Sequence, residues 1–282
     1  MKKYYLKSNA KLNLTLGING KLKSGLHKIE SLVSFIDLHD LIKINKINSK
    51  NKKIKFYGKF SKEIKKFNTI FKLLKILDKK NLLNNQKFYI KIKKNIPQKS
   101  GFGGGSMNVS SLLKFFIKYK IINVPQKTIY KLADSVGSDV KLGLVKKNII
   151  LLSNRRVITT TKKLKLFVLA VKPNFGCSTK DIYKKVKHYS KIKLNNRSHS
   201  SFNLINFSKL KNDLETIAFK KYPKLKKINS FLYSLPYIKL VRMTGSGSAL
   251  IGYFITKNDA ENAAKLFKIK YKNYWCIVSK TI

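Results

Sequence analysis

The sequence contains few acidic residues, few arginines and few cysteines. Of its 282 residues 12 are Asp or Glu, against 62 Lys or Arg, so the formal net charge is +50. The two cysteines, Cys177 and Cys276, have no C-x-x-C spacing, and the four histidines follow no metal-ligand pattern. These shortages exclude a disulfide-stapled secreted domain and leave no zinc motif.

Long apolar segments are also missing. The longest relevant apolar run, Leu166–Val171, is far shorter than a membrane span, and Lys7 and Lys11 interrupt any N-terminal signal core. Hydrophobic residues make up 43% of the chain and aromatic residues 11%, which excludes a disordered protein. We therefore expect a soluble cytoplasmic protein, long enough for two domains of ordinary size.

The basic excess has two interpretations. A strongly basic chain is typical of proteins that bind nucleic acids, because lysines neutralise phosphates. However, only four of the 62 basic residues are arginines, the residue type that binds phosphates and bases bidentately. The lysines are spread over the whole chain and accompany many Asn, Ile, Phe and Tyr, as in proteins of AT-rich genomes. We interpret the charge mainly as composition bias that also steers anionic ligands, with a nucleic-acid-binding protein as an alternative.

Hydrophobic periodicity predicts strands that alternate with helices, in two α+β layers. Period-2 alternation predicts strands over residues 12–18, 41–47, 54–57 and 88–94. Further strands are expected over 166–171 and 274–279, and a hairpin-like pair over 238–243 and 249–255. Helical spacing predicts helices over 106–119, 126–135, 179–189, 209–219, 224–235 and 258–269, and one that begins at Asn68 as its N-cap. The polar segment 155–165 lacks strong periodicity, and we place a domain boundary there, between domains 1–160 and 161–282.

Four of the 14 glycines gather in one loop, at Gly101, Gly103, Gly104 and Gly105. The loop reads P-Q-K-S-G-F-G-G-G-S-M from Pro97, after a predicted strand and before a predicted helix. Glycines let backbone N–H groups converge on one point, and the helix N-terminus adds partial positive charge, so this arrangement favours phosphate binding over a merely flexible turn. Its spacing is neither that of a Walker loop nor that of a Rossmann fingerprint.

The loop resembles the P-x-x-x-G-L-G-S/G-S-S hallmark of the GHMP kinases. Two further segments agree with this resemblance. The turn T-G-S-G-S over residues 244–248 looks like the third motif of the family. The opening A-K-L-N-L at residues 10–14, followed by S-G-L-H-K-I-E at 24–30, resembles the branch that acts on 4-diphosphocytidyl-2-C-methyl-D-erythritol. The segments G-S-D-V at 137–140 and N-D-L-E at 212–215 also match.

The resemblance implies a fold and an activity. The fold is a two-domain α+β GHMP kinase, with a ribosomal-protein-S5-like α/β domain followed by a ferredoxin-like α+β domain. The activity is ATP-dependent phosphorylation of the 2-hydroxyl of 4-diphosphocytidyl-2-C-methyl-D-erythritol, in the non-mevalonate (MEP) route to isoprenoids. It implies ATP and Mg²⁺, no specific nucleic acid, no membrane, and a monomer or homodimer. Another GHMP kinase, of homoserine or mevalonate type, is the nearest alternative.

The resemblance also implies the residues of the site. Asp139 is expected to act as the catalytic acid/base, paired with Lys11. The expected nucleotide-binding residues are Pro97, Gly101, Gly103, Gly104, Gly105, Ser106 and Met107, with the Ser106 hydroxyl near Mg²⁺ and no protein metal cluster. The expected substrate-binding residues are Asn13, His27, Thr179, Tyr183, Gly245 and Ser246. Leu26 stands where the branch usually has a tyrosine that stacks on cytosine, so Tyr183 is expected to supply aromatic contact.

Overall fold

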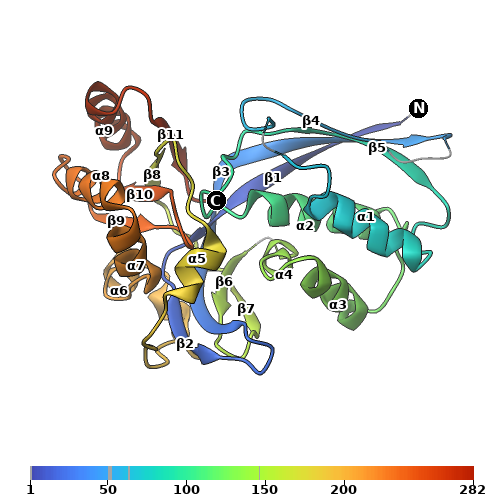
Figure 1. The fold of residues 1–282 in the computed structure, drawn as a ribbon, viewed down its shortest axis with the longest axis horizontal. Helices are drawn as coiled ribbons and strands as arrows, with labels where there is room; N and C mark the ends of the chain where they lie inside the picture. Colours follow the sequence, from blue (N-terminus) through green and yellow to red (C-terminus); the bar gives the residue numbers. More distant parts are fainter. Residues whose placement is uncertain (1, 50–52, 63, 146) are drawn as a thin grey trace. The chain divides into compact units, whose positions relative to one another are not determined.

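The computed structural model describes residues 2–49, 53–62, 64–145 and 147–282. The chain forms two compact units, each assembled from separate segments (Figure 1). The first unit comprises Met1–Ala10, Leu38–Gln98 and Gly103–Lys146, and the second comprises Lys11–Asp37, Lys99–Phe102 and Lys147–Ile282. Both contain strands and helices, which confirms the α+β class. The predicted division of the sequence after residue 160 stays a prediction.

The first unit packs helices against a sheet. Its elements are β4 (Lys53–Tyr57), β5 (Lys87–Lys93), α1 (Thr69–Lys79), α2 (Gly104–Lys118), α3 (Gln126–Val136), α4 (Val140–Gly143), the start of β1 (Lys3–Asn13) and the end of β3 (His27–Ile47). β5 pairs antiparallel with β3 and parallel with β4. Alternate residues such as Ile42, Ile44 and Ile90 face the core, where they meet the apolar faces of α1, α2 and α3.

The first helix shows how local sequence sets these boundaries. The Asn68 side chain accepts hydrogen bonds from the backbone N–H groups of Ile70, at 3.0 Å, and Phe71, at 3.2 Å. These bonds satisfy donors that have no partner inside the helix, so the predicted N-cap is confirmed. Four apolar residues at helical spacing are buried on one face of α1: Ile70, Leu73, Leu74 and Leu77.

The second unit contains a sheet in the order β11-β8-β10-β9. Besides the end of β1 and the start of β3, the unit contains these elements: β2 (Gly17–Lys21), β6 (Asn148–Leu151), β7 (Val157–Thr160), β8 (Phe167–Lys172), α5 (Thr179–Lys184), the 3₁₀ turn η1 (Ser198–Ser201), α6 (Leu204–Ser208), α7 (Leu214–Lys221), α8 (Pro223–Tyr233), β9 (Leu240–Met243), β10 (Leu250–Phe254), α9 (Lys257–Lys270) and β11 (Trp275–Lys280). Helices α8 and α9 lie on one side of this sheet (Figure 1). Leu169, Ile228 and Phe267 belong to the shared core.

Some predicted boundaries were wrong. The helix predicted over 209–219 begins only at Leu214. The Asn212 side chain donates to the carbonyls of Met243 and Gly245 and accepts from the Leu214 N–H. These bonds hold the backbone before Leu214 outside the helix. The helix predicted over 179–189 ends at Lys184. The segment 155–165, for which its weak periodicity predicted no strand, contains β7, which pairs antiparallel with β6. Among the described residues, no helix is long and apolar enough to cross a membrane.

Candidate active site

The glycine loop lies between β5 and α2, as predicted. Gly103 is the N-cap of α2, with φ 67° and ψ 20°, a left-handed conformation that glycine adopts without steric penalty. Having no side chain, Gly103 caps none of the first N–H groups of the helix. Gly105 is exposed, while Gly104 and Ser106 are half-buried. Uncapped N–H groups at the positive end of a helix of this length favour a bound phosphate.

The chain that leads into the loop passes very close to the second glycine turn. Gly101 has a φ of 82°, and a Cβ at this position would lie 1.9 Å from the carbonyl oxygen of Thr244. The Ser248 N–H also donates to the carbonyl of Lys99, at 3.2 Å. Only glycine fits at residue 101, because any side chain would collide with a backbone carbonyl.

Two residues of the predicted nucleotide set lie in the interior of the first unit. Pro97 is buried, and Met107 is 3% exposed, with its backbone N–H bonded to the carbonyl of Gly103. A Cβ at Gly143 would lie 2.9 Å from the Met107 sulfur, so this side chain packs against α4. Direct contact of Pro97 and Met107 with a nucleotide stays a prediction.

Asp139 lies at the N-cap position of α4, in the turn that follows α3. The Ser110 hydroxyl of α2 lies 2.9 Å from the carbonyl oxygen of Ser106 and 2.6 Å from that of Val140, and so joins the starts of α2 and α4. Asp139 is half-buried, and its side chain makes no capping hydrogen bond. The Asp139 side chain is therefore not used to cap α4.

Lys11 and Asn13 form a buried polar group in the second unit. They are 4% and 5% exposed, and the Lys11 ammonium donates to the Asn13 side-chain oxygen. The Asn13 side-chain nitrogen donates to the Ser31 hydroxyl at 2.8 Å, and its backbone N–H donates to the Thr244 hydroxyl at 3.0 Å. A buried ammonium is costly unless it is hydrogen-bonded, and this chain of bonds orients it. The predicted pairing of Lys11 with Asp139 stays a prediction.

The second glycine turn joins β9 to β10 and is buried throughout. The Asn212 side-chain nitrogen donates to the carbonyls of Met243, at 2.7 Å, and Gly245, at 2.8 Å. The Ser246 hydroxyl lies 2.9 Å from that of Thr179, the first residue of α5. The structure thus brings together three of the predicted substrate-binding residues, Thr179, Gly245 and Ser246.

His27 and Tyr183, two further predicted substrate residues, are in contact. Their ring centroids are 5.1 Å apart, and the rings are inclined by 44°. Burial, and secondly the nearby charge of Lys21, lower the pKa of His27 from its ordinary value of 6.5. The buried Nε2 atom of His27 has no hydrogen-bond partner within the described chain. A neutral imidazole with one uncommitted nitrogen beside an aromatic ring fits a planar, hydrogen-bonding ligand.

Sequence reasoning missed two buried carboxylates on β3, Glu30 and Asp40. They are 4% and 0% exposed, and both accept hydrogen bonds from distant segments. For Asp40 a signal existed in the period of the strand, since it lies on the same face as Ile42 and Ile44 and so points inward. Its partners lie 54 to 68 residues further along the chain and follow no recognisable spacing.

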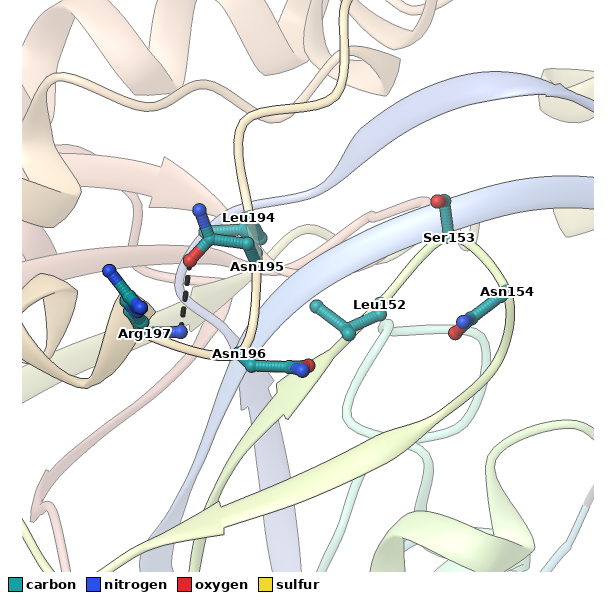
Figure 2. A pocket seen from close by; sticks show the side chains of 7 residues that line it. All are labelled: Leu152, Ser153, Asn154, Leu194, Asn195, Asn196 and Arg197. Carbon is teal, nitrogen blue, oxygen red and sulfur yellow. Dashed lines mark hydrogen bonds between the residues drawn. The ribbon is translucent and has the colours of Figure 1, made fainter.

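The second unit also has an open surface pocket of about 450 Å³ (Figure 2). It is lined by Leu152, Ser153, Asn154, Leu194, Asn195, Asn196 and Arg197, none of them a predicted site residue. The Arg197 N–H donates to the Asn195 side chain at 2.9 Å, so part of its wall is a local turn. In the described part of the chain, no three His, Cys, Asp or Glu side chains are grouped to hold a metal ion.

Two family models match the chain. The GHMP kinase N-terminal domain matches residues 68–146, and the GHMP kinase C-terminal domain matches residues 191–273. The first match contains the glycine loop and Asp139.

Relatives and solved structures agree with these matches. A protein of Pelagibacter ubique named 4-diphosphocytidyl-2-C-methyl-D-erythritol kinase is 52% identical to this chain, and the alignment covers 100% of both chains. One of the same name from Thermodesulfovibrio yellowstonii is 31% identical over 98% of this chain and 97% of its own.

A crystal structure of 4-(cytidine 5'-diphospho)-2C-methyl-D-erythritol kinase superposes with a TM-score of 0.77 at 20% identity, covering 98% of this chain and 99% of its own. Homoserine kinase from Cytophaga hutchinsonii superposes with a TM-score of 0.73 at 14% identity, covering 100% of this chain and 95% of its own. At these identities the two structures establish the fold. Together with the full-length relatives, they show that this chain belongs to the GHMP kinases, in the branch whose members are named 4-diphosphocytidyl-2-C-methyl-D-erythritol kinase.

Proposed function

We propose that this protein transfers the γ-phosphate of ATP to the 2-hydroxyl of 4-diphosphocytidyl-2-C-methyl-D-erythritol. The observation that carries the proposal is the 52% identity, over the full length of both chains, with a relative named for this activity. The uncapped first turn of α2 supports it, since this is the geometry that receives a phosphate chain. The reaction would belong to the non-mevalonate route to isoprenoids, in the cytoplasm, with the enzyme as a monomer or homodimer.

Asp139 is the proposed acid/base. The bond from the 2-hydroxyl oxygen to the γ-phosphorus forms while the bond from that phosphorus to the β–γ bridging oxygen breaks, and ADP leaves. The hydroxyl proton passes to the Asp139 carboxylate, whose side chain is not committed to capping α4. Lys11 is proposed to supply positive charge to the reacting oxygens, oriented by its bond to Asn13.

Mg²⁺ is proposed to enter with ATP. Mg²⁺ prefers oxygen ligands and usually keeps phosphate oxygens and waters, so it needs few protein groups. The hydroxyl of Ser106, half-buried in the first turn of α2, fits as the protein oxygen. When bound, the ion would neutralise negative charge on the transferring phosphoryl group.

The second unit supplies the proposed acceptor-binding residues. His27 and Tyr183 would contact the cytosine ring, and Tyr183 would supply aromatic surface that Leu26 lacks. Asn13, Thr179, Gly245 and Ser246 would contact the remainder of the acceptor. In the described structure the Asn13 side chain is hydrogen-bonded to Ser31 and that of Thr179 to Ser246, which keeps these groups in place before substrate arrives.

The decisive assay is ADP release from ATP with and without 4-diphosphocytidyl-2-C-methyl-D-erythritol. We expect ADP release to depend on this acceptor and the product to carry a new phosphate on the 2-hydroxyl. Homoserine and mevalonate belong in the same panel, because the homoserine kinase fold is nearly as similar. Turnover of either of these instead, or steeply salt-dependent binding of nucleic acid without any turnover, would overturn the proposal.

A further inference from the structure

Asp40 joins the two sides of the glycine loop. Its Oδ1 atom accepts from the backbone N–H groups of Asn95, at 2.8 Å, and Ile96, at 2.9 Å, in the segment that leads into the loop. Its Oδ2 atom accepts from the side-chain nitrogen of Asn108, at 2.9 Å, on the helix that follows the loop. The same oxygen is bonded by the ammonium of Lys94. A single carboxylate thus binds both segments that support the loop.

This network is fully buried and belongs to the first unit. Asp40 is 0% exposed, Asn108 1% and Lys94 4%. Ion pairs are seldom buried, because removing two charges from water is costly unless further hydrogen bonds satisfy them. Here the carboxylate accepts three such bonds besides that from Lys94, so its geometry is fixed from several directions.

Two details connect the network to the loop itself. A Cβ at Gly104, the first residue of α2, would lie 3.4 Å from the Lys94 ammonium nitrogen and 3.0 Å from the Ile96 side chain. The residues that Asp40 holds therefore lie directly behind the first turn of the helix. The Asn108 amide turns its nitrogen toward Asp40, and its own oxygen is buried without a hydrogen-bond partner among the described residues. A buried amide oxygen without a partner costs free energy, and the bond from the amide nitrogen to the Asp40 carboxylate fixes this orientation.

We propose that Asp40 is a positioning residue for nucleotide binding, which holds the N–H groups of the glycine loop in the geometry that ATP requires. The inference rests on the proposed function only in taking ATP as the ligand of the loop. Backbone donors bind an anion well when they are already arranged around its position, and a carboxylate fixed behind the loop arranges them without touching the nucleotide. Loss of the Asp40 contacts should therefore weaken ATP binding even in a variant that still folds.

The test compares three variants with the wild type, by ATP titration calorimetry and thermal unfolding. Asp40→Asn removes the charge, and Asn108→Leu cuts the contact to α2 while leaving the pair of Asp40 and Lys94 intact. Glu30→Gln is the matched control, because Glu30 is a buried carboxylate that accepts from two backbone N–H groups, those of Lys193 and Leu194, in the second unit.

We expect Asp40→Asn and Asn108→Leu to raise the Kd for ATP by about tenfold or more. Glu30→Gln should lower the melting temperature but leave the Kd for ATP within about twofold, because Glu30 bonds Lys193 and Leu194 and not the segments that Asp40 holds. If Asp40→Asn does not fold, Asn108→Leu decides the question. Wild-type ATP affinity in folded Asn108→Leu or Asp40→Asn would overturn the inference. Because calorimetry needs no turnover, a wild type that binds ATP but does not phosphorylate the acceptor would refute only the proposed function.

Discussion

The two units hold different parts of the predicted site and build them differently. The first unit contains the glycine loop from Gly103 onward and Asp139, and offers backbone N–H groups in a half-exposed turn. The second unit contains the predicted substrate residues and Lys11, and its glycine turn is buried. Here polar side chains are fixed by bonds to one another, as in Lys11 with Asn13 or Thr179 with Ser246. Substitutions in the glycine loop from Gly103 onward or at Asp139 should therefore change nucleotide binding or turnover, and those of the predicted substrate residues in the second unit should change acceptor binding or stability.

The largest effect is expected for Asp139→Asn. The amide keeps the size of the side chain but cannot receive the hydroxyl proton, so kcat should fall by about 10²- to 10⁴-fold. ATP binding should remain, since the loop is unchanged. Steady-state ADP release and ATP calorimetry measure the two quantities. Asp134→Asn, on the exposed end of α3, is the control and should keep wild-type kcat. Wild-type kcat in Asp139→Asn would remove this residue from the chemistry.

A large loss of stability is expected for Gly101→Ala, in the second unit. Gly25→Ala is a well-matched control, because Gly25 has a φ of 80° and nothing within 4 Å of its Cβ position, whereas Gly101 has a φ of 82° and a carbonyl at 1.9 Å. Both variants place alanine in a left-handed backbone conformation, which costs about 1–2 kcal/mol in free energy of unfolding. The collision should cost Gly101→Ala about 1–3 kcal/mol more in free energy of unfolding. Urea denaturation measures the difference, and equal losses would show that the close approach to Thr244 is absent.

The smallest effect concerns His27 and pH. Burial and the charge of Lys21 lower its pKa below 6.5, so the folded state favours the neutral ring. Stability that depends on this neutral ring is present above pH 6.5 and is lost as the pH falls below that value. The KM for the cytidyl acceptor should likewise rise only at pH values below 6.5.

His27→Gln should abolish this rise of the KM at low pH. It should also raise the KM at neutral pH by about threefold to tenfold, which corresponds to the free energy of one hydrogen bond. KM measured across the acid range tests this expectation. His188→Gln, at an exposed histidine, should leave the pH profile unchanged. If the KM of His27→Gln still rises below pH 6.5 as in the wild type, a group other than His27 causes this rise.

Local patterns predicted the elements well where local physics decides them. The N-cap at Asn68 and the apolar face of α1 followed from spacing alone, because a helix satisfies its own backbone and buries one face. The start of α7 did not, because the Asn212 side chain is bonded to a turn more than 30 residues away. The short strand β7 was also not predicted from the local pattern, since its pairing with β6 stabilises it.

The candidate site divides in the same way. The sequence by itself determined the glycine loop, the family resemblance and the candidate residues Lys11 and Asp139, because motifs at fixed spacing are local in the chain. The tertiary structure alone decided which polar groups are buried and what they bind. The Asp40 carboxylate meets Lys94 and Asn108 only after the chain has folded, and the value of a buried charge depends on partners that no local pattern specifies.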